Sequence, residues 1–327
     1  MLQDNFGRTI DYLRISITDR CNLRCRYCMP ESGVESLPHH DVLSYEELLR
    51  ITRIAVTLGV RKVRITGGEP LVRRGLVGFI QQLRALDPDL ELALTTNGLL
   101  LAGLAQELKA AGLNRINVSL DSLNPARFRE ISRRDGLADV LAGLQRAAAV
   151  GFSPLKINMV PIHGVNDDEI EAFAELARAS PWELRFIEYM PVSEGLDYSP
   201  SQRVSAAEIL TRLQRLGNLE TVCAAASAGP ANCYRIAGYA GVIGIIPSVS
   251  QHFCGECNRL RLTADGRLRP CLFSTAEIDL RSRLRAGAGD AELGDLLLQA
   301  IGSKPLGHRI GNADFAHASR RMHGIGG

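Results

Sequence analysis

The sequence predicts an α/β fold, a partial (β/α)6 barrel of the TIM type followed by a small C-terminal α+β domain. From residue 12 to about residue 190, short β-branched runs alternate with longer segments of helical periodicity, as in parallel (β/α) arrays. Several predicted strands are polar on one face, whereas strands covered on both faces are usually apolar throughout. A water-filled lumen explains this and favours an open barrel. Periodicity alone also allows a doubly wound sheet, with the polar face as a salt-bridged surface.

The predicted elements follow the chain in order. Strands are expected at 12–18, 61–66, 90–95, 114–119, 154–160 and 183–189. Helices are expected at 44–58, where Ser44 precedes two glutamates as a start signal, and at 73–86, 101–111, 124–150 (broken near 135–136) and 166–179. In the C-terminal part we expect helices near 205–215, 276–285 and 290–301, and strands near 219–224, 233–237, 241–246, 258–264 and 267–271.

The alternation of strands and helices stops after Met190-Pro191. Residues 191–203 are rich in Pro, Gly and Ser, so they form the predicted linker. This divides the chain into a barrel domain, 1–190, and a C-terminal domain, 204–327.

Composition excludes several classes of protein. The 327 residues are 46% hydrophobic, enough for a large core, and the formal net charge of +2 predicts no nucleic-acid or membrane partner. The N-terminus lacks the apolar core of a secretory signal, and no 18-residue apolar run occurs. Six of the eight cysteines fall into two tight triplets, which favours metal binding in a reducing cytosol over disulfides. We therefore expect a cytoplasmic protein.

The first triplet is Cys21, Cys25 and Cys28, spaced Cys-x3-Cys-x2-Cys after the first predicted strand. Three thiolates in one loop can hold a 4Fe-4S cubane and leave one iron open to a non-protein ligand. The alternatives are a zinc site and buried thiols. Zinc normally takes four ligands, and nothing nearby completes such a set.

The second triplet is Cys254, Cys257 and Cys271, spaced Cys-x2-Cys-x13-Cys. Asp265-Gly266 predicts a hairpin that would bring the three thiols together. A cluster with one open iron is expected here too. Zinc stays open as an alternative, because Cys-x2-Cys is a common zinc motif and His252 could supply a fourth ligand.

Cationic side chains are predicted to face the same lumen. Arg259 and Arg261 lie two residues apart on one strand, so they project to one face and suit a polyanion such as a triphosphate. Solvent-facing arginines are the alternative. The inward positions of other strands include Arg14, Arg64 and Lys156. Turns at 67–70 and 95–98 carry small residues that would let a ligand approach the backbone.

Residues 19–30, Asp-Arg-Cys-Asn-Leu-Arg-Cys-Arg-Tyr-Cys-Met-Pro, resemble the cluster loop of the radical S-adenosylmethionine (SAM) superfamily. With Phe-Cys-Gly-Glu-Cys-Asn-Arg-Leu-Arg-Leu-Thr at 253–263, the spacing to Cys271 and the terminal Gly326-Gly327, the chain resembles the GTP 3',8-cyclase family of molybdenum-cofactor biosynthesis over nearly its whole length. Gly229-Pro230-Ala231, Lys304-Pro305 and His308 also match. Cys223 and Cys233 lie outside the motifs and are expected in the core.

The resemblance implies a lyase that converts GTP to 3',8-cyclo-7,8-dihydro-GTP with two 4Fe-4S clusters and SAM. The first cluster would cleave SAM to a 5'-deoxyadenosyl radical that takes hydrogen from C3' of GTP, and the second cluster would hold the guanine. The SAM positions matched are Tyr27, Gly68, Ser119 and Met190. The GTP positions are Arg14, Arg64, Thr95, Lys156, Arg185, Arg259, Leu260 and Arg261. The catalytic set comprises Arg14, Arg259, Arg261 and the tail residues Gly326 and Gly327.

The resemblance also implies partners. We expect a homodimer that passes its product to the cyclic pyranopterin monophosphate synthase and takes electrons from an unidentified reductant protein. Two rivals stay open: a peptide-modifying radical SAM enzyme with auxiliary clusters, and a zinc- or cluster-binding regulator without catalysis.

Overall fold

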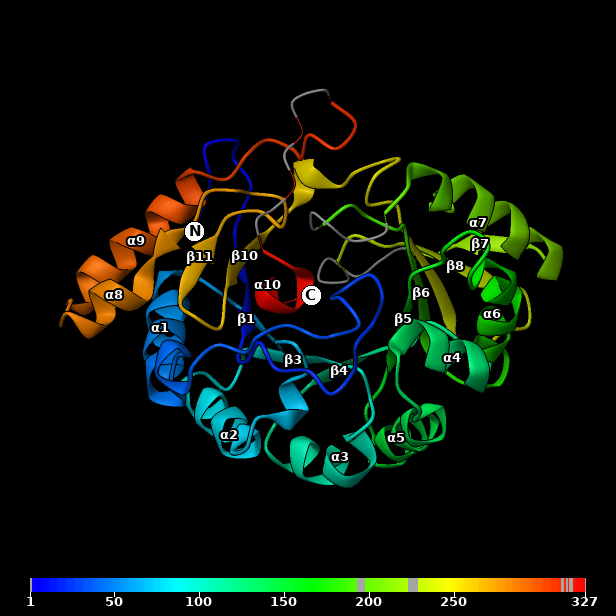
Figure 1. Cartoon of the computed structure of the whole chain (residues 1–327), viewed down its shortest axis with the longest axis horizontal. Helices are drawn as coiled ribbons and strands as arrows, with labels where there is room; N and C mark the ends of the chain where they lie inside the picture. Colours follow the sequence, from blue (N-terminus) through cyan, green and yellow to red (C-terminus); the bar gives the residue numbers. More distant parts are fainter. Residues whose placement is uncertain are drawn as a thin grey trace.

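One continuous sheet organises the computed structural model, which describes residues 2–192, 198–222, 229–312, 315, 317 and 320–326. Within these residues the sheet has twelve strands in the order β12-β11-β10-β1-β2-β3-β4-β5-β6-β9-β8-β7. The sheet curves around a central space that holds the C-terminal end of the described chain (Figure 1). The predicted open, barrel-like parallel sheet is confirmed.

Six parallel strands form the middle of the sheet. They are β1 (Tyr12–Ser16), β2 (Lys62–Thr66), β3 (Glu91–Thr96), β4 (Arg115–Ser119), β5 (Lys156–Met159) and β6 (Glu183–Ile187). Each was predicted to within three residues at either end, because their β-branched runs are bounded by polar turns. Leu13 and Ile15 of β1 point to the outer core and are fully buried, whereas Arg14 between them points inward.

Helices cover the convex side of this sheet (Figure 1). They are α1 (Tyr45–Leu58), α2 (Leu76–Leu86), α3 (Leu101–Ala110), α4 (Pro125–Ser132), α5 (Leu137–Ala149) and α6 (Ile170–Ala179). Ser44 caps α1 by accepting a hydrogen bond from the Glu47 amide, 3.1 Å long, as the start signal predicts. The break expected near 135–136 separates α4 from α5.

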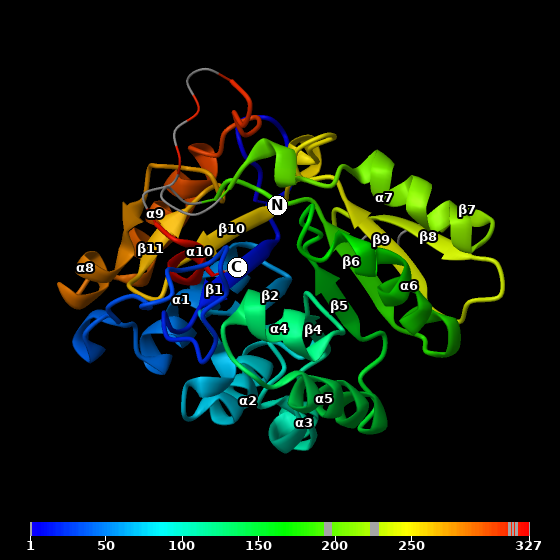
Figure 2. The same ribbon diagram turned by 45° about the vertical axis from the view of Figure 1, so that its right-hand side comes forward.

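The C-terminal part extends both edges of the sheet. β9 (Val242–Ile246) pairs in parallel with β6, and β8 (Asn232–Ile236) and β7 (Leu219–Thr221) follow it antiparallel. At the opposite edge, β10 (Arg259–Leu262) pairs in parallel with β1 (Figure 2). The division into domains at 190–204 stays a prediction, because strands from both sides of the predicted linker share one sheet.

The hairpin predicted at Asp265-Gly266 is present. β10 and β11 (Arg267–Arg269) are antiparallel, with Arg261 opposite Arg269. A short strand that we did not predict, β12 (Ile278–Asp279), continues the edge, and α8 (Leu280–Arg285) therefore starts later than expected.

The remaining helices are α7 (Ala206–Leu213), α9 (Asp290–Gly302) and α10 (Met322–Ile325). α7 covers the β9 side of the sheet, and α9 packs against α1. α10 was not predicted, and it lies within the curve of the sheet (Figures 1 and 2). Its Ile325 is 1% exposed and packs in a small apolar cluster with Val192. None of the helices in the described ranges is long and apolar enough to span a bilayer.

Candidate active site

A cavity of about 350 Å³ occupies the concave side of the sheet. The polar inward positions of the strands line it, as predicted, and so do both cysteine triplets. The cysteines concerned are Cys21, Cys25, Cys28, Cys254, Cys257 and Cys271. The loop after β1, which carries the first triplet, and the hairpin of β10 and β11, which carries the second, therefore line the same cavity.

The loop of the first triplet is held by its own backbone and by the end of α4. The amides of Cys28 and Met29 donate to the Cys25 carbonyl over 2.9 and 3.1 Å. The amides of Arg24 and Arg26 donate to the carbonyls at residues 132 and 131. Arg133 Nη1 donates to the Met29 carbonyl over 2.9 Å. All these contacts fix a loop of eight residues against one helix end.

Gly67 and Gly68 explain why a turn of small residues faces this loop. A Cβ on Gly68 would lie 2.4 Å from the Arg20 carbonyl oxygen, and one on Gly67 would lie 2.7 Å from that of Thr18. The Gly68 amide itself donates to the Thr18 carbonyl over 2.7 Å. Only glycine allows the two backbones to approach this closely.

Glu69 joins the two small-residue turns that the sequence singled out. It is 1% exposed, and its carboxylate accepts from the Thr96 hydroxyl and the Asn97 amide, both at 2.7 Å. Burial raises the pKa of Glu69 to about 7 although these hydrogen bonds oppose the shift. Sequence reasoning missed this residue, even though it completes the Gly-Gly-Glu-Pro turn.

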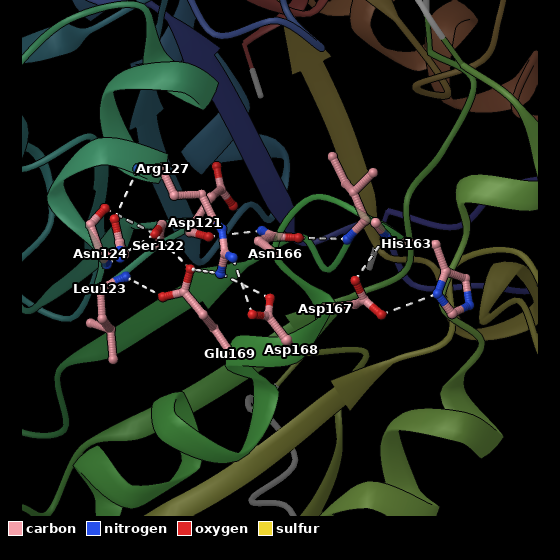
Figure 3. A network of polar contacts seen from close by, with 12 residues as sticks. Asp121, Ser122, Leu123, Asn124, Arg127, His163, Asn166, Asp167, Asp168 and Glu169 are labelled. Atoms are coloured by element: carbon pink, nitrogen blue, oxygen red, sulfur yellow. Dashed lines mark hydrogen bonds and ion pairs between the residues drawn. The ribbon is translucent and has the colours of Figure 1, made fainter.

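Tyr27 is tied to the end of β4. Its hydroxyl donates to Asp121, and the Val160 amide donates to the other carboxylate oxygen over 2.9 Å. Burial, followed by the charge of Asp121, raises the pKa of Tyr27 well above its usual value, so the phenol stays protonated. Asn166 donates to the Asp121 carbonyl over 2.7 Å (Figure 3).

A polar network holds the segment after Asp121 in place (Figure 3). Glu169 accepts from the Ser122 hydroxyl over 2.7 Å and from the Leu123 amide over 2.6 Å. Arg127 donates to the same carboxylate over 2.6 Å. The network thus fixes the exit of β4, which carries Ser119 and Asp121 into the cavity.

The cysteines of both triplets are available as metal ligands. All seven described cysteines are free thiols, and burial raises the pKa of Cys28 to about 12. A thiol of this kind keeps its proton unless a metal cation takes the proton's place. Among the described residues no group of three or more His, Cys, Asp or Glu side chains is arranged to hold a metal ion. In a cubane each thiolate binds a different iron.

Two cysteines, Cys223 and Cys233, lie outside the triplets. Cys233 is buried, as predicted, in an apolar cluster with Ala231 and Ile246. Cys223 lies outside the described residues.

Strand pairing assembles the cationic side chains into rows. Arg14 lies opposite Arg261 on one side and Arg64 on the other. In the next row Tyr12 lies between Arg259 and Lys62. β10 therefore adds its two arginines directly to those of the barrel.

Tyr12 is a cavity residue that sequence reasoning did not assign. The Arg64 Nε donates to its hydroxyl, and the Lys62 ammonium lies 5.0 Å from its ring centroid. Burial alone would raise the pKa of Tyr12, but the surrounding cations outweigh burial and lower it to about 7. Arg64 also donates to the Thr95 hydroxyl over 3.1 Å.

Lys156 is paired with Glu183, another residue that was not predicted. The ammonium lies 2.6 Å from Glu183 Oε2, and Arg185 Nε lies 2.5 Å from Oε1. Burial, followed by the charge of Arg185, lowers the pKa of Lys156 to about 8. For Glu183, burial would raise the pKa, but Arg185 and Lys156 outweigh it and lower the pKa, so the carboxylate is charged.

The C-terminal tail enters the cavity. The Gly326 carbonyl accepts from Arg261 Nη1 over 2.8 Å, and a Cβ on Gly326 would lie 2.5 Å from Thr66 Oγ1. Met322 and His323 line the cavity. Gly327, predicted with Gly326, lies outside the described residues.

The other predicted site residues divide into two groups. Ser119, Met190, Thr95 and Arg185 line the cavity. Leu260 does not: its side chain is 3% exposed and packs in the hydrophobic core, because it alternates with the inward Arg259 and Arg261. A role of Leu260 in GTP binding therefore stays a prediction, and its side chain does not face the cavity.

Comparison with known proteins decides between the open interpretations. The chain is 48% identical to the GTP 3',8-cyclase of Syntrophomonas wolfei, with 99% of each chain covered. It is 49% identical to that of Geobacter sulfurreducens, covering 100% of this chain and 99% of the relative. The chain belongs to the GTP 3',8-cyclase family.

Family profiles agree with this assignment. Residues 15–177 match the radical SAM superfamily, and residues 182–310 match Molybdenum Cofactor Synthesis C. Among solved structures, Streptococcus suis SuiB bound to precursor peptide SuiA has a TM-score of 0.59 at 18% identity, covering 92% of this chain and 66% of that chain. This likeness shows a shared fold only. Membership of the GTP 3',8-cyclase family excludes both rivals, the peptide-modifying enzyme and the non-catalytic regulator.

Proposed function

We propose that this chain converts GTP into (8S)-3',8-cyclo-7,8-dihydroguanosine 5'-triphosphate, the first step of molybdenum-cofactor biosynthesis. The observation that carries the proposal is that two thiol triplets and a row of arginines line one cavity. An enzyme that only cleaved SAM would need one triplet. The second triplet and the arginines supply binding groups for a large polyanionic substrate.

The first triplet, Cys21, Cys25 and Cys28, would hold a 4Fe-4S cluster with SAM at its open iron. Bound there, this pair supplies an organic radical that can remove a hydrogen atom. The chain's own contribution is placement. Gly68 allows the turn to pass close to the cysteine loop, and Tyr27 is fixed by Asp121. Ser119 and Met190 complete the wall proposed for SAM.

The arginines and lysines would bind the triphosphate. Burial, followed by the charge of Arg259, lowers the pKa of Arg261 to about 10. Burial, followed by the charge of Arg261, also lowers the pKa of Arg14. Cations packed this closely repel one another, so a bound anion stabilises all of them. Bidentate guanidinium contacts suit phosphate oxygens. We assign this role to Arg14, Arg64, Lys156, Arg185, Arg259 and Arg261, with Thr95 beside them.

The second triplet, Cys254, Cys257 and Cys271, would hold a second 4Fe-4S cluster that binds the guanine. Support comes from its free thiols and from its position on the same cavity. Arg261 holds Gly326 at the same place, so the tail, with Gly327, would contact the reacting substrate.

The partners that we propose are those that the family resemblance implies. We propose a cytoplasmic homodimer that takes electrons from a reductant protein and passes its product to the cyclic pyranopterin monophosphate synthase. The near-neutral formal charge of +2 supports the absence of a nucleic-acid partner.

The test is an anaerobic incubation of the reduced, reconstituted protein with SAM and GTP. We expect 5'-deoxyadenosine and a cyclised nucleotide to form together. Omission of GTP should prevent the nucleotide product and leave at most slow SAM cleavage. Formation of 5'-deoxyadenosine without any change in GTP would refute the proposed reaction.

A further inference from the structure

The N-terminal hairpin and the segment that follows α9, residues 302–308, meet beside the second cysteine triplet, although neither carries a cysteine. An isolated bridge pairs Gln3 with Thr9 in an N-terminal hairpin, and Asn5 donates to the Gly302 carbonyl over 2.8 Å. Farther along, a Cβ on Gly307 would lie 3.6 Å from the Cβ of Cys254. Both segments therefore lie close enough to contact this triplet.

Arg8 connects the N-terminal hairpin with the first cysteine of the triplet. The side chains of Asp4 and Arg8 are 0% and 6% exposed, and Arg8 Nε lies 2.6 Å from Asp4 Oδ2. Nη1 donates to the Cys254 carbonyl over 2.6 Å. Nη1 and Nη2 also donate to the carbonyls of Leu306 and Pro305, over 3.1 and 2.7 Å. One guanidinium thus joins three separate segments.

Lys304 connects the other two cysteines. Its side chain is buried, and Nζ donates to the carbonyls of Arg259 and Pro270 over 2.8 and 2.7 Å. The ammonium is also hydrogen bonded with the Cys257 thiol. Arg259 follows Cys257 by two residues, and Pro270 immediately precedes Cys271. Lys304 therefore ties the two strands of the hairpin together at their cysteine ends.

The geometry points to a positioning role for Asp4, Arg8 and Lys304, which we call the terminal clamp: it holds the second triplet in the arrangement that binds a second cluster. This inference rests on the proposed second cluster. A buried cation carries a desolvation cost, and an apolar side chain would stabilise the fold at least as well. Three of the five carbonyls that accept from these cations lie at or within two residues of a cysteine of the triplet, which a general anchor would not require.

The experiment compares amide hydrogen exchange in Lys304→Met and Arg8→Lys with the unchanged protein, all without iron and under anaerobic conditions. Methionine keeps roughly the length of the lysine side chain without its hydrogen-bond donors. Lysine keeps the charge of Arg8 without the several donors of the planar guanidinium group. We expect exchange roughly tenfold faster in peptides from 252–258 and 270–274, because charged buried hydrogen bonds are lost. Peptides from 20–33 should be unchanged.

Two matched controls have the same chemistry elsewhere. Lys109 donates to the Gly151 carbonyl over 2.9 Å, and Arg84 donates to the carbonyls of Pro88 and Gly112 over 2.6 and 2.9 Å. Neither residue lines the cavity. Lys109→Met and Arg84→Lys should leave exchange in both cysteine regions unchanged.

Iron content gives a second readout. After reconstitution we expect about eight irons per unchanged chain and about four in the Lys304→Met variant, with SAM cleavage retained. Equal exchange in the variant and the control, or equal loss of iron from both triplets, would overturn the clamp. Should Lys304→Met fail to fold by circular dichroism, Arg8→Lys decides by the same criteria. Failure of the unchanged protein to cyclise GTP would refute the proposed function without affecting the exchange comparison.

Discussion

The two cysteine regions line the same cavity but are constructed in opposite ways. Cys21, Cys25 and Cys28 lie within eight residues, and backbone hydrogen bonds to the end of α4 hold their loop. Cys254 and Cys271 lie at the two ends of a hairpin, and the side chains of Arg8, in the N-terminal hairpin, and Lys304, after α9, bind the backbone beside them. The contacts of the first region reach residues about a hundred positions away, mostly through backbone groups, whereas those of the second run across nearly the whole sequence through side chains.

This difference teaches which region is the more vulnerable. Several backbone hydrogen bonds hold the first loop, so the loss of any one side chain leaves most of its contacts in place. The second triplet depends on single side chains such as Arg8 and Lys304, each of which joins segments that are distant in sequence. Single substitutions should therefore separate the two regions in function.

The largest expected effect comes from the cysteines themselves. Cys25→Ser should abolish both SAM cleavage and product formation, because the first cluster loses one of its three ligands. Cys254→Ser should retain SAM cleavage and lose productive GTP binding. Measurement of 5'-deoxyadenosine and cyclised nucleotide in parallel checks both variants. Loss of SAM cleavage in both would contradict the division of labour between the triplets.

The next largest effect tests how closely the first loop is held. Gly68→Ala would place a methyl group 2.4 Å from the Arg20 carbonyl, and the backbone must shift at a cost of about 1–3 kcal/mol. We expect a reduced iron content at the first triplet and loss of SAM binding. Gly78→Ala is the control, because nothing lies within 4 Å of its Cβ and it lies in α2. Equal iron in the two variants would show that the loop adapts.

Sequence reasoning succeeded where the signal is local. The six barrel strands, the break between α4 and α5 and the Asp265-Gly266 hairpin all follow from short patterns. It missed what depends on long-range pairing. Nothing local indicates that β9 and β10 extend opposite edges of the barrel.

The same limit applies to the site. Arg14 and Arg64 were found from strand alternation, which a short segment reveals. Tyr12 gains its cationic surroundings from the strands on both sides of β1, since β2 places Lys62 and Arg64 near it and β10 places Arg259 beside it. Likewise Glu183 matters only through its pairing with Lys156 on the neighbouring strand. Residues of this kind become visible when the register of the strands is known.

A smaller effect is expected at the tail, which touches the arginines of β10. Gly326 has a φ of +80°, and an added Cβ would lie 2.5 Å from Thr66 Oγ1. Gly326→Ala should therefore displace the tail and reduce product formation about tenfold, since a backbone conformation of this kind costs of order 1–3 kcal/mol. Gly324→Ala, which meets nothing within 4 Å, should be nearly neutral. Equal activities would mean that the tail's position is unimportant.

The smallest expected effect is the pH dependence of GTP binding through Lys156. Its pKa is lowered to about 8, chiefly by burial, so the ammonium loses its proton at lower pH than a free lysine does. Only the charged form attracts a triphosphate. We expect the dissociation constant of GTP to rise roughly five- to tenfold between pH 7 and pH 9.

Lys156→Arg provides the decisive comparison, because a guanidinium keeps its charge over this whole range. The Lys156→Arg variant should bind GTP with little pH dependence. Lys156→Met, which lacks the charge, should bind GTP weakly at every pH, as the unchanged protein does at high pH. Calorimetry under anaerobic conditions measures all three proteins with GTP and with guanosine. Guanosine lacks the phosphates, so its binding should not change with pH through Lys156. A pH dependence that persists in Lys156→Arg would assign the titration to another group, and Tyr12, whose pKa is about 7, would be the next residue to test.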